Sequence, residues 1–419
     1  MKTFLVAQAR KFSFFLLTCI GRLLPDIKPY KSELVLPRQS SPIRLPLNIE
    51  QLPQKFARRF FLKKTINERY IHFFRNVYVN GDAVIFKNLR VYRPSLAWQP
   101  YIKWYKSGRF LVRQWLFKVK TVDSSQTAAL VYNQWGYENY YHWMIESLPR
   151  LLLIQQRFPN ALLIVPEPAP EFITATISLL GFRNTISLPT EKMELLKVAR
   201  LIMPSLEFEK AGEYFIPGNN AQLTIARQMK QSTVLKVNDD DLIVSVKNGI
   251  LKHFLPQRPR KRIYVSRSRQ KFRRLMNEKD LEPILKRFGF ETVYFEGMSF
   301  VEQVKLMQET ELLLSTHGAN LVNLLFLPPA AILIEMVNID FTNDVYYTLA
   351  SDLKLSYYSI PCTMIDKTLV PDDDELVLND TVNFTDQMVA LNNAHLEVDI
   401  SLVEETIKMA IIGNSTNIN

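Results

Sequence analysis

Two blocks of this sequence alternate between apolar runs of strand length and helical segments, and this alternation constrains the fold more than any other feature. The first block covers residues 128–205 and the second covers residues 260–361. Parallel strands need long crossover connections, usually helices, so the alternation predicts parallel sheets with right-handed crossovers. We therefore expect an α/β protein with two facing Rossmann-like domains. The expected strands are 129–132, 162–165, 185–188 and 198–203 in the first block, and 263–266, 291–295, 312–314, 331–336 and 356–360 in the second.

The regions around these blocks set the expected domain boundaries. A chain of 419 residues exceeds the usual size of one hydrophobic core, so two main domains are expected. Prolines break up residues 25–60, and an Asn80-Gly81 turn between two apolar-aromatic runs predicts a hairpin. The expected parts are residues 1–60, a basic helix and Pro-rich arm; 61–240, a Rossmann-like domain with a β-rich insertion; 241–365, a second Rossmann-like domain; and 366–419, an acidic loop and a C-terminal helix.

The net charge of +11 indicates an anionic partner. Nucleotide phosphates, acidic lipid headgroups and anionic glycans all fit this charge, whereas the basic stretch 258–274 has too few interleaved aromatic residues to favour a nucleic acid. The sequence contains no Gly-x-Gly-x-x-Gly, Walker A or HExxH motif, which argues against a dinucleotide dehydrogenase or a P-loop NTPase. Two distant cysteines, Cys19 and Cys362, exclude a Cys-based metal cluster and are compatible with a reducing compartment.

Residues 1–24 raise the question of membrane contact. An apolar run from Phe12 to Ile20 is flanked by basic residues and is too short to span a bilayer, which takes about 20 residues. Two interpretations remain open: a basic amphipathic helix lying on an anionic membrane surface, and a terminal helix packed on its own domain. We expect a cytoplasmic protein, peripheral at the inner face of the cytoplasmic membrane if the first interpretation holds.

A first group of polar residues lies at the start of the helix expected at 139–158. His142 and Glu146 are four residues apart and Arg150 follows after another four, so the three share one helical face. A histidine–carboxylate pair facing an interdomain cleft can take a proton from an attacking hydroxyl. The structural alternative is a surface ion pair with a capping role. Asn139 and Tyr140 directly precede this pair.

A second group follows the strand expected at 263–266. Ser266 and Arg267 end this strand, and Arg273 and Asn277 come shortly after it. Guanidinium groups beyond a strand end suit a diphosphate, because they bind phosphate oxygens in a bidentate manner. The alternative is a solvated basic loop.

A third group surrounds a turn of small residues, His317-Gly318-Ala319-Asn320, after the strand expected at 312–314. Free N–H groups at such a turn favour anions, and the small residues permit close approach of the backbone. A purely structural histidine is the alternative. Glu335 is a charge inside an apolar run, and ribose hydroxyls are one way to supply the hydrogen bonds that it would need if buried.

Taken together, these segments resemble glycosyltransferase family 61 over residues 128–340. The segment from Asn139 to Leu151 resembles the first motif of that family, and Ser266-Arg267 with Arg273 and Asn277-Glu278 resembles the second. The segments His317 to Asn323, Phe326 to Pro329 and Ile334-Glu335 resemble the third. The resemblance implies a GT-B-like α/β fold, here with a β-rich N-terminal elaboration. It also implies a nucleotide-sugar donor on the C-terminal domain and inversion at the anomeric carbon without an obligatory metal.

We therefore expect an inverting, metal-independent hexosyl- or pentosyltransferase of the GT-B type, acting in surface polysaccharide biosynthesis without a cofactor. It would move a sugar from a nucleoside-diphosphate sugar to a glycan or lipid-linked acceptor. Glu146 is the expected general base, oriented by His142, and His317 is the second candidate. The alternative is a non-catalytic glycan- or nucleotide-binding subunit of a polysaccharide assembly complex. The expected donor-binding residues are Ser266, Arg267, Arg273, Asn277, Gly318, Ala319, Asn320 and Glu335, and the expected acceptor-side residues are Asn139, Tyr140 and Arg150.

Overall fold

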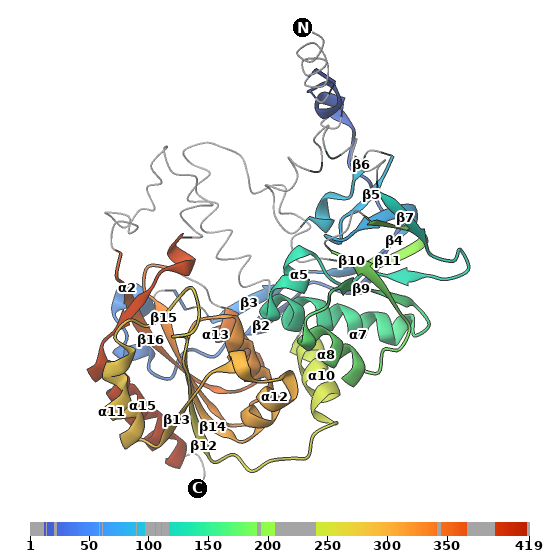
Figure 1. Cartoon of the computed structure of the whole chain (residues 1–419). Coiled ribbons are helices and arrows are strands. Elements are labelled where there is room, and N and C mark those ends of the chain that lie inside the picture. The colour runs from blue at the N-terminus through green and yellow to red at the C-terminus, as the bar shows by residue number, and fades with distance from the viewer. Residues whose placement is uncertain are drawn as a thin grey trace. The chain divides into compact units, whose positions relative to one another are not determined.

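The computed structural model describes residues 12–205, 240–366 and 390–416, apart from gaps at 14, 21–22, 58, 61, 89, 97–104, 106–109, 111–116, 191–193 and 342–344. The chain forms two compact units, one comprising Met1–Gln39 and Asn67–Pro217 and the other Ser40–Ile66 and Gly218–Asn419 (Figure 1). Each unit combines helices with a sheet, so the prediction of an α/β protein is confirmed. Residues 206–239 and most of the acidic loop expected after residue 366 lie outside the described residues.

The second unit contains a sheet with the strand order β13-β12-β14-β15-β16-β17. The first five strands of this order pair in parallel and β17 pairs antiparallel with β16. In chain order the parallel strands read 2-1-3-4-5, which is a doubly wound arrangement whose switch point lies between β12 and β14. Ligands bind beyond the carboxyl ends of the strands at such a point. The strands are β12 (Lys261–Val265), β13 (Phe290–Val293), β14 (Thr310–Thr316), β15 (Ile332–Asn338), β16 (Ser356–Met364) and β17 (Leu396–Val398).

Helices connect these strands as the alternation predicted. A capping box begins α12 (Phe300–Gln308), because the Ser299 side chain accepts from the Glu302 amide and the Glu302 carboxylate accepts from the Ser299 amide. Residues Ala319–Phe326 form a 3-10 helix directly after β14, with most of its apolar side chains buried. The α-helices are α10 (Asp240–Leu251), α11 (Glu282–Arg287), α12 (Phe300–Gln308), α13 (Val345–Asp352) and α15 (Ile400–Thr416).

The Pro-rich stretch is partly built into the second unit rather than extended throughout. It contributes strands β2 (Gln39–Pro42) and β3 (Lys63–Ile66), which pair with each other, and the short helix α2 (Gln54–Ala57). The side-chain amide of Asn48 donates to the Ser359 carbonyl at 2.8 Å and accepts from the Ser359 backbone amide at 3.1 Å. These two hydrogen bonds attach the Pro-rich stretch to the backbone of β16. A fully buried ion pair joins Lys64 to Asp352 at the end of α13.

The first unit has a mixed sheet with the strand order β10-β9-β8-β11-β4-β5-β6. Strands β8, β9, β10 and β11 pair in parallel, and the long β4 continues the sheet in antiparallel fashion. The hairpin expected at Asn80-Gly81 is confirmed, because β4 and β5 pair antiparallel on either side of it. The strands are β1 (Lys31–Leu36), β4 (Arg69–Asn80), β5 (Ile85–Lys87), β6 (Arg90–Val91), β7 (Lys118–Thr121), β8 (Ala128–Ala129), β9 (Leu162–Glu167), β10 (Thr185–Pro189) and β11 (Glu194–Pro204).

The helices of the first unit are α5 (Gln134–Glu138), α6 (Tyr140–His142), α7 (Leu148–Arg157) and α8 (Glu171–Leu179). Between α6 and α7, residues Trp143–Ser147 form a π-helical turn, so the helix expected at 139–158 is continuous but locally widened. Over the described residues, no helix has both the length and the apolar character needed to cross a bilayer.

Candidate active site

Arg267 and Gly318 meet at the switch point of the second unit. Arg267 lies two residues beyond the end of β12, and Gly318 lies two residues beyond the end of β14, its parallel neighbour. A Cβ atom placed on Gly318 would overlap Nη1 of Arg267 and would lie 2.5 Å from its Cζ. Only a residue without a side chain therefore allows the guanidinium to occupy this position.

The two predicted donor-site arginines carry charge that the protein does not compensate. Arg267 is 6% exposed, and its Nη2 donates to the carbonyl of Phe272 at 3.3 Å. Burial, followed by the charge of Arg273, lowers the pKa of Arg267 to about 10, and burial also lowers the pKa of Arg273. Among the described residues neither guanidinium forms an ion pair with a carboxylate, and the Nε atom of each is buried without a hydrogen-bond partner. Such a pair of desolvated cations favours an anionic ligand.

His317 stands beside these arginines and is held by a carboxylate. Its Nδ1 lies 2.6 Å from Oε1 of Glu335, and its backbone amide donates to the carbonyl of Met336 at 2.9 Å. Because a carboxylate accepts hydrogen bonds, Nδ1 carries the proton, and Nε2 keeps a free lone pair when the ring is neutral. Burial lowers the pKa of His317 despite Glu335, and the nearby arginines lower it further. The neutral imidazole is thus the favoured form.

Two tyrosines complete this cluster, and sequence reasoning did not find them. The Tyr357 hydroxyl donates to Oε2 of Glu335 at 2.7 Å, and the Tyr346 hydroxyl donates to the carbonyl of Gly318 at 2.6 Å. The ring of Tyr346 also lies 4.9 Å from that of His317. Tyrosines in an apolar strand and helix look like ordinary core residues, so the sequence offers no signal that singles them out.

The other residues expected to bind the donor differ in their exposure and in the hydrogen bonds that they already form within the protein. The side-chain amide of Asn277 binds the backbone of β17. It donates to the Val398 carbonyl at 2.8 Å and accepts from the Val398 amide at 3.2 Å. Ser266 is fully buried, and its hydroxyl lies 3.0 Å from that of Ser268. Glu335 has a protein partner for each oxygen, so its carboxylate is placed to orient His317, and its expected contact with a ribose stays a prediction. Ala319 and Asn320 are partly exposed at the turn.

The first unit brings His142, Glu146 and Arg150 together, as their spacing predicted. Nδ1 of His142 lies 2.6 Å from Oε1 of Glu146, and Nη2 of Arg150 lies 3.9 Å from Oε2 of the same carboxylate. The Glu146 side chain is 1% exposed, whereas that of His142 is 15% exposed. The imidazole is therefore the member of the pair that solvent or a substrate can reach.

Neighbouring residues of the first motif fix this pair in place. The Asn139 side chain caps α6 by accepting from the amide of Tyr141 at 2.9 Å, and Nη1 of Arg150 donates to the Val131 carbonyl at 3.1 Å. Tyr140 packs its ring against Phe172, with centroids 5.1 Å apart. These contacts give Asn139 and Arg150 clear positioning roles within the unit.

The π-helical turn carries Glu146, and the sequence analysis did not foresee it. Pro149 at the start of α7 has no N–H to bond the carbonyl four residues earlier, so the preceding turn can widen without losing a donor. Gly136 permits α5 to approach this turn, since a Cβ there would lie 2.7 Å from Oγ of Ser147. Pro149 is the sequence feature that could have indicated the π-helical turn. Such turns are frequent at functional sites.

No group of three or more histidine, cysteine, aspartate or glutamate side chains among the described residues could hold a metal ion. The positive charge at the switch point comes from arginines instead. In other doubly wound proteins, this point at the carboxyl ends of the strands is where phosphorylated ligands bind.

Comparison with known proteins identifies a family for part of this chain. Residues 140–334 match the model of the family Glycosyltransferase 61. A segment of 91 residues is 34% identical to the EGF domain-specific O-linked N-acetylglucosamine transferase of Drosophila melanogaster, and it covers 21% of this chain and 17% of the fly protein. The family predicted from the three motifs is thus confirmed: the chain carries a glycosyltransferase family 61 domain.

Proposed function

We propose that this protein is an inverting glycosyltransferase that moves a sugar from a nucleoside-diphosphate sugar to a glycan or lipid-linked acceptor. In this proposal it is a GT-B-like enzyme whose donor-binding residues belong to the second unit and whose proton-transfer residues belong to the first. The observation that carries the proposal is the uncompensated Arg267 guanidinium, seated on Gly318 at the switch point of a doubly wound sheet.

The leaving group is the step that these arginines serve. When the bond between the anomeric carbon and the diphosphate oxygen breaks, the electron pair stays on the diphosphate, whose negative charge rises. Arg267 and Arg273 are desolvated and already in place, so they stabilise that charge more strongly in the transition state than water would. This supports departure of the diphosphate without a metal ion.

A histidine paired with a carboxylate supplies the base. Inversion requires the acceptor hydroxyl to attack from the face opposite the diphosphate, so the base and the arginines act on opposite faces of the sugar. His317 belongs to the arginine cluster, and we therefore place it with the leaving group. His142 then takes the acceptor proton on Nε2, while Glu146 holds Nδ1 and stabilises the imidazolium.

This assignment exchanges the roles that sequence reasoning gave to His142 and Glu146. The support is geometric, because the Glu146 carboxylate is nearly fully buried beneath the more exposed imidazole. Glu335 likewise becomes a positioning residue for His317, assisted by Tyr357.

The test is release of nucleoside diphosphate from a panel of nucleotide sugars, with and without a chelator. Donors of N-acetylglucosamine come first, because the fly relative is named for transfer of that sugar. The proposal predicts turnover of at least one donor that survives chelation. Tight nucleotide binding with no turnover on any donor would favour the non-catalytic binding subunit instead.

A further inference from the structure

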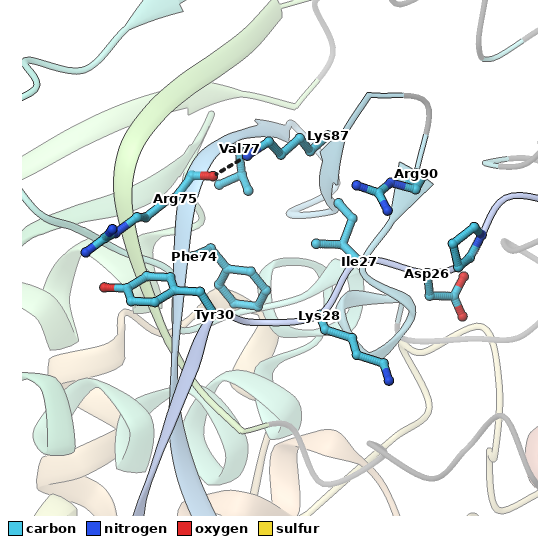
Figure 2. Close-up of a pocket in the computed structure, with 10 residues that line it drawn as sticks. Asp26, Ile27, Lys28, Tyr30, Phe74, Arg75, Val77, Lys87 and Arg90 are labelled. Carbon is cyan, nitrogen blue, oxygen red and sulfur yellow. Dashed lines mark hydrogen bonds between the residues drawn. The ribbon is translucent and has the colours of Figure 1, made fainter.

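A cavity of about 440 Å³ in the first unit contains none of the residues assigned above. It lies between residues 25–30 and the antiparallel strands β4, β5 and β6 (Figure 2). Its apolar floor consists of Ile27, Phe74 and Val77, all of them buried. A volume of this size is within the range of small-ligand pockets, which run from about 300 to 1,000 Å³.

The wall formed by residues 25–30 is fixed to the sheet on both sides. The Ile27 amide donates to the carbonyl of Val91 in β6 at 3.0 Å, and the Tyr30 amide donates to the carbonyl of Phe73 in β4 at 2.9 Å. Asp26 forms an ion pair with Arg93, with 2.8 Å between Oδ2 and Nε. The cavity is therefore framed by ordered backbone from three segments of the chain.

The rim of the cavity is cationic. Lys28, Arg75, Lys87 and Arg90 line it, and the single carboxylate in the lining, that of Asp26, is already paired with Arg93. Figure 2 shows the Arg90 guanidinium directed toward Ile27, inside the ring of lining side chains. Neither Lys28 nor Arg90 forms an ion pair with a carboxylate among the residues that the structure describes. Their charge is available to an anion.

An exposed apolar stripe immediately precedes this cavity in the chain. Residues 15–20 are helical, and Leu23 is 83% exposed two residues before Pro25. Phe12, Phe15, Leu16 and Ile20 follow the spacing i, i+3, i+4, i+8, which is the spacing of one helical face. Together with Leu23, these exposed apolar residues form the stripe.

We propose that this part of the first unit binds an anionic phospholipid surface. The lipid phosphate is held by Lys28 and Arg90 over the apolar floor of the cavity, and the stripe of residues 12–23 lies among the acyl chains at the interface. The cationic rim and the apolar stripe together indicate a phospholipid surface as the ligand. A soluble phosphate compound would leave the stripe exposed to water, and a second copy of this basic chain would bring like charges together.

The test is flotation of the full chain with vesicles of phosphatidylcholine alone or with about 30% phosphatidylglycerol, a fraction that gives a strongly anionic surface. Lys28→Glu/Arg90→Glu reverses the two rim charges assigned to the phosphate, and Phe15→Ser/Leu23→Ser removes two exposed apolar side chains of the stripe. Lys252→Glu/Lys286→Glu is the matched control, because it makes the same change in net charge at two exposed lysines of the second unit. Melting temperature and gel filtration establish that each variant is folded.

We expect flotation with the anionic vesicles only, a loss of about tenfold or more in bound fraction for the rim and stripe variants, and little change for the control. Equal losses for the rim variant and its control would overturn the proposal, because they would indicate diffuse charge alone. Competition by soluble glycerol phosphate as effective as by vesicles, or self-association that Phe15→Ser/Leu23→Ser abolishes in the absence of lipid, would also overturn it. Flotation requires no sugar transfer, so its failure would leave the proposed enzymatic function untouched.

Discussion

The Arg267 guanidinium occupies the space that a side chain on residue 318 would need, so residues just beyond the ends of two adjacent parallel strands jointly define one cation position. This relationship links the second and third sequence motifs, which lie about fifty residues apart in the chain. It predicts that changes at Gly318 act through Arg267, although Gly318 itself has no side chain.

Gly318→Ala should therefore weaken donor binding. The added methyl group displaces Arg267, and we expect the Kd for nucleoside diphosphate to rise about tenfold or more, since small misplacements of a binding group have large effects. Gly297→Ala is the control, because a Cβ at Gly297 meets no atom within 4 Å. Titration calorimetry of both variants gives the comparison, and equal affinities would show that the close approach has no role in binding.

Arg267→Ala should reduce donor affinity further. Loss of a buried charged contact costs about 2–5 kcal/mol, which corresponds to roughly 30-fold or more in Kd. Arg258→Ala serves as the control, since Arg258 is exposed and carries the same charge. If both substitutions produce the same small change, the diphosphate site lies elsewhere.

The assignment of the base can be tested by comparing two substitutions in the first unit. His142→Ala should lower kcat by about 10² to 10⁴ if the imidazole takes the acceptor proton. Glu146→Gln should lower kcat less, because it removes the orienting charge but leaves the base. The reverse order, with Glu146→Gln the more damaging change in a folded protein, would restore the carboxylate as the base.

The buried His317 predicts a pH dependence of stability. Its pKa in the folded state is below its ordinary value because burial disfavours the charged ring. The unfolded chain then binds more protons below about pH 6.5, so the free energy of unfolding should fall as pH decreases from 6.5 toward the folded pKa. Burial and the charge of Arg274 also lower the pKa of His395. His395 therefore adds to the same decrease in the free energy of unfolding as pH falls.

His317→Gln isolates the part that belongs to His317. Urea unfolding between pH 5 and pH 8 should show a smaller dependence on pH for this variant than for the natural protein. His253→Gln, at an exposed histidine, is the matched substitution for comparison. An undiminished slope in His317→Gln would show that His317 does not titrate as its burial implies.

Local chemistry made much of the second unit predictable. Apolar runs with intervening helices predicted its parallel strands, and the Ser299–Glu302 capping box is a helix start that depends on residues only three positions apart. Strand ends and turn residues also pointed to Arg267 and His317, because ligands of parallel α/β sheets bind where strand ends meet the following helices.

Contacts between distant residues were beyond sequence reasoning. Nothing local to Asn48 or Lys64 indicates partners at Ser359 and Asp352, roughly three hundred residues away. The same limit applies to Glu335, whose hydrogen bond from the Tyr357 hydroxyl has no local signal in the sequence. The exposure difference between His142 and Glu146 depends on packing around a π turn, which helical periodicity does not contain.

We propose that Arg267 and its neighbours hold the diphosphate of a sugar donor during transfer. The most direct measurement is the rate of nucleoside diphosphate release from a panel of nucleotide sugars, in the presence of a chelator, for the natural protein, Arg267→Ala and Arg258→Ala. The account predicts turnover of at least one donor by the natural protein and by Arg258→Ala, and a loss of about 30-fold or more in kcat/KM for Arg267→Ala. Absence of release from every donor, or release that Arg267→Ala leaves unchanged, would contradict it.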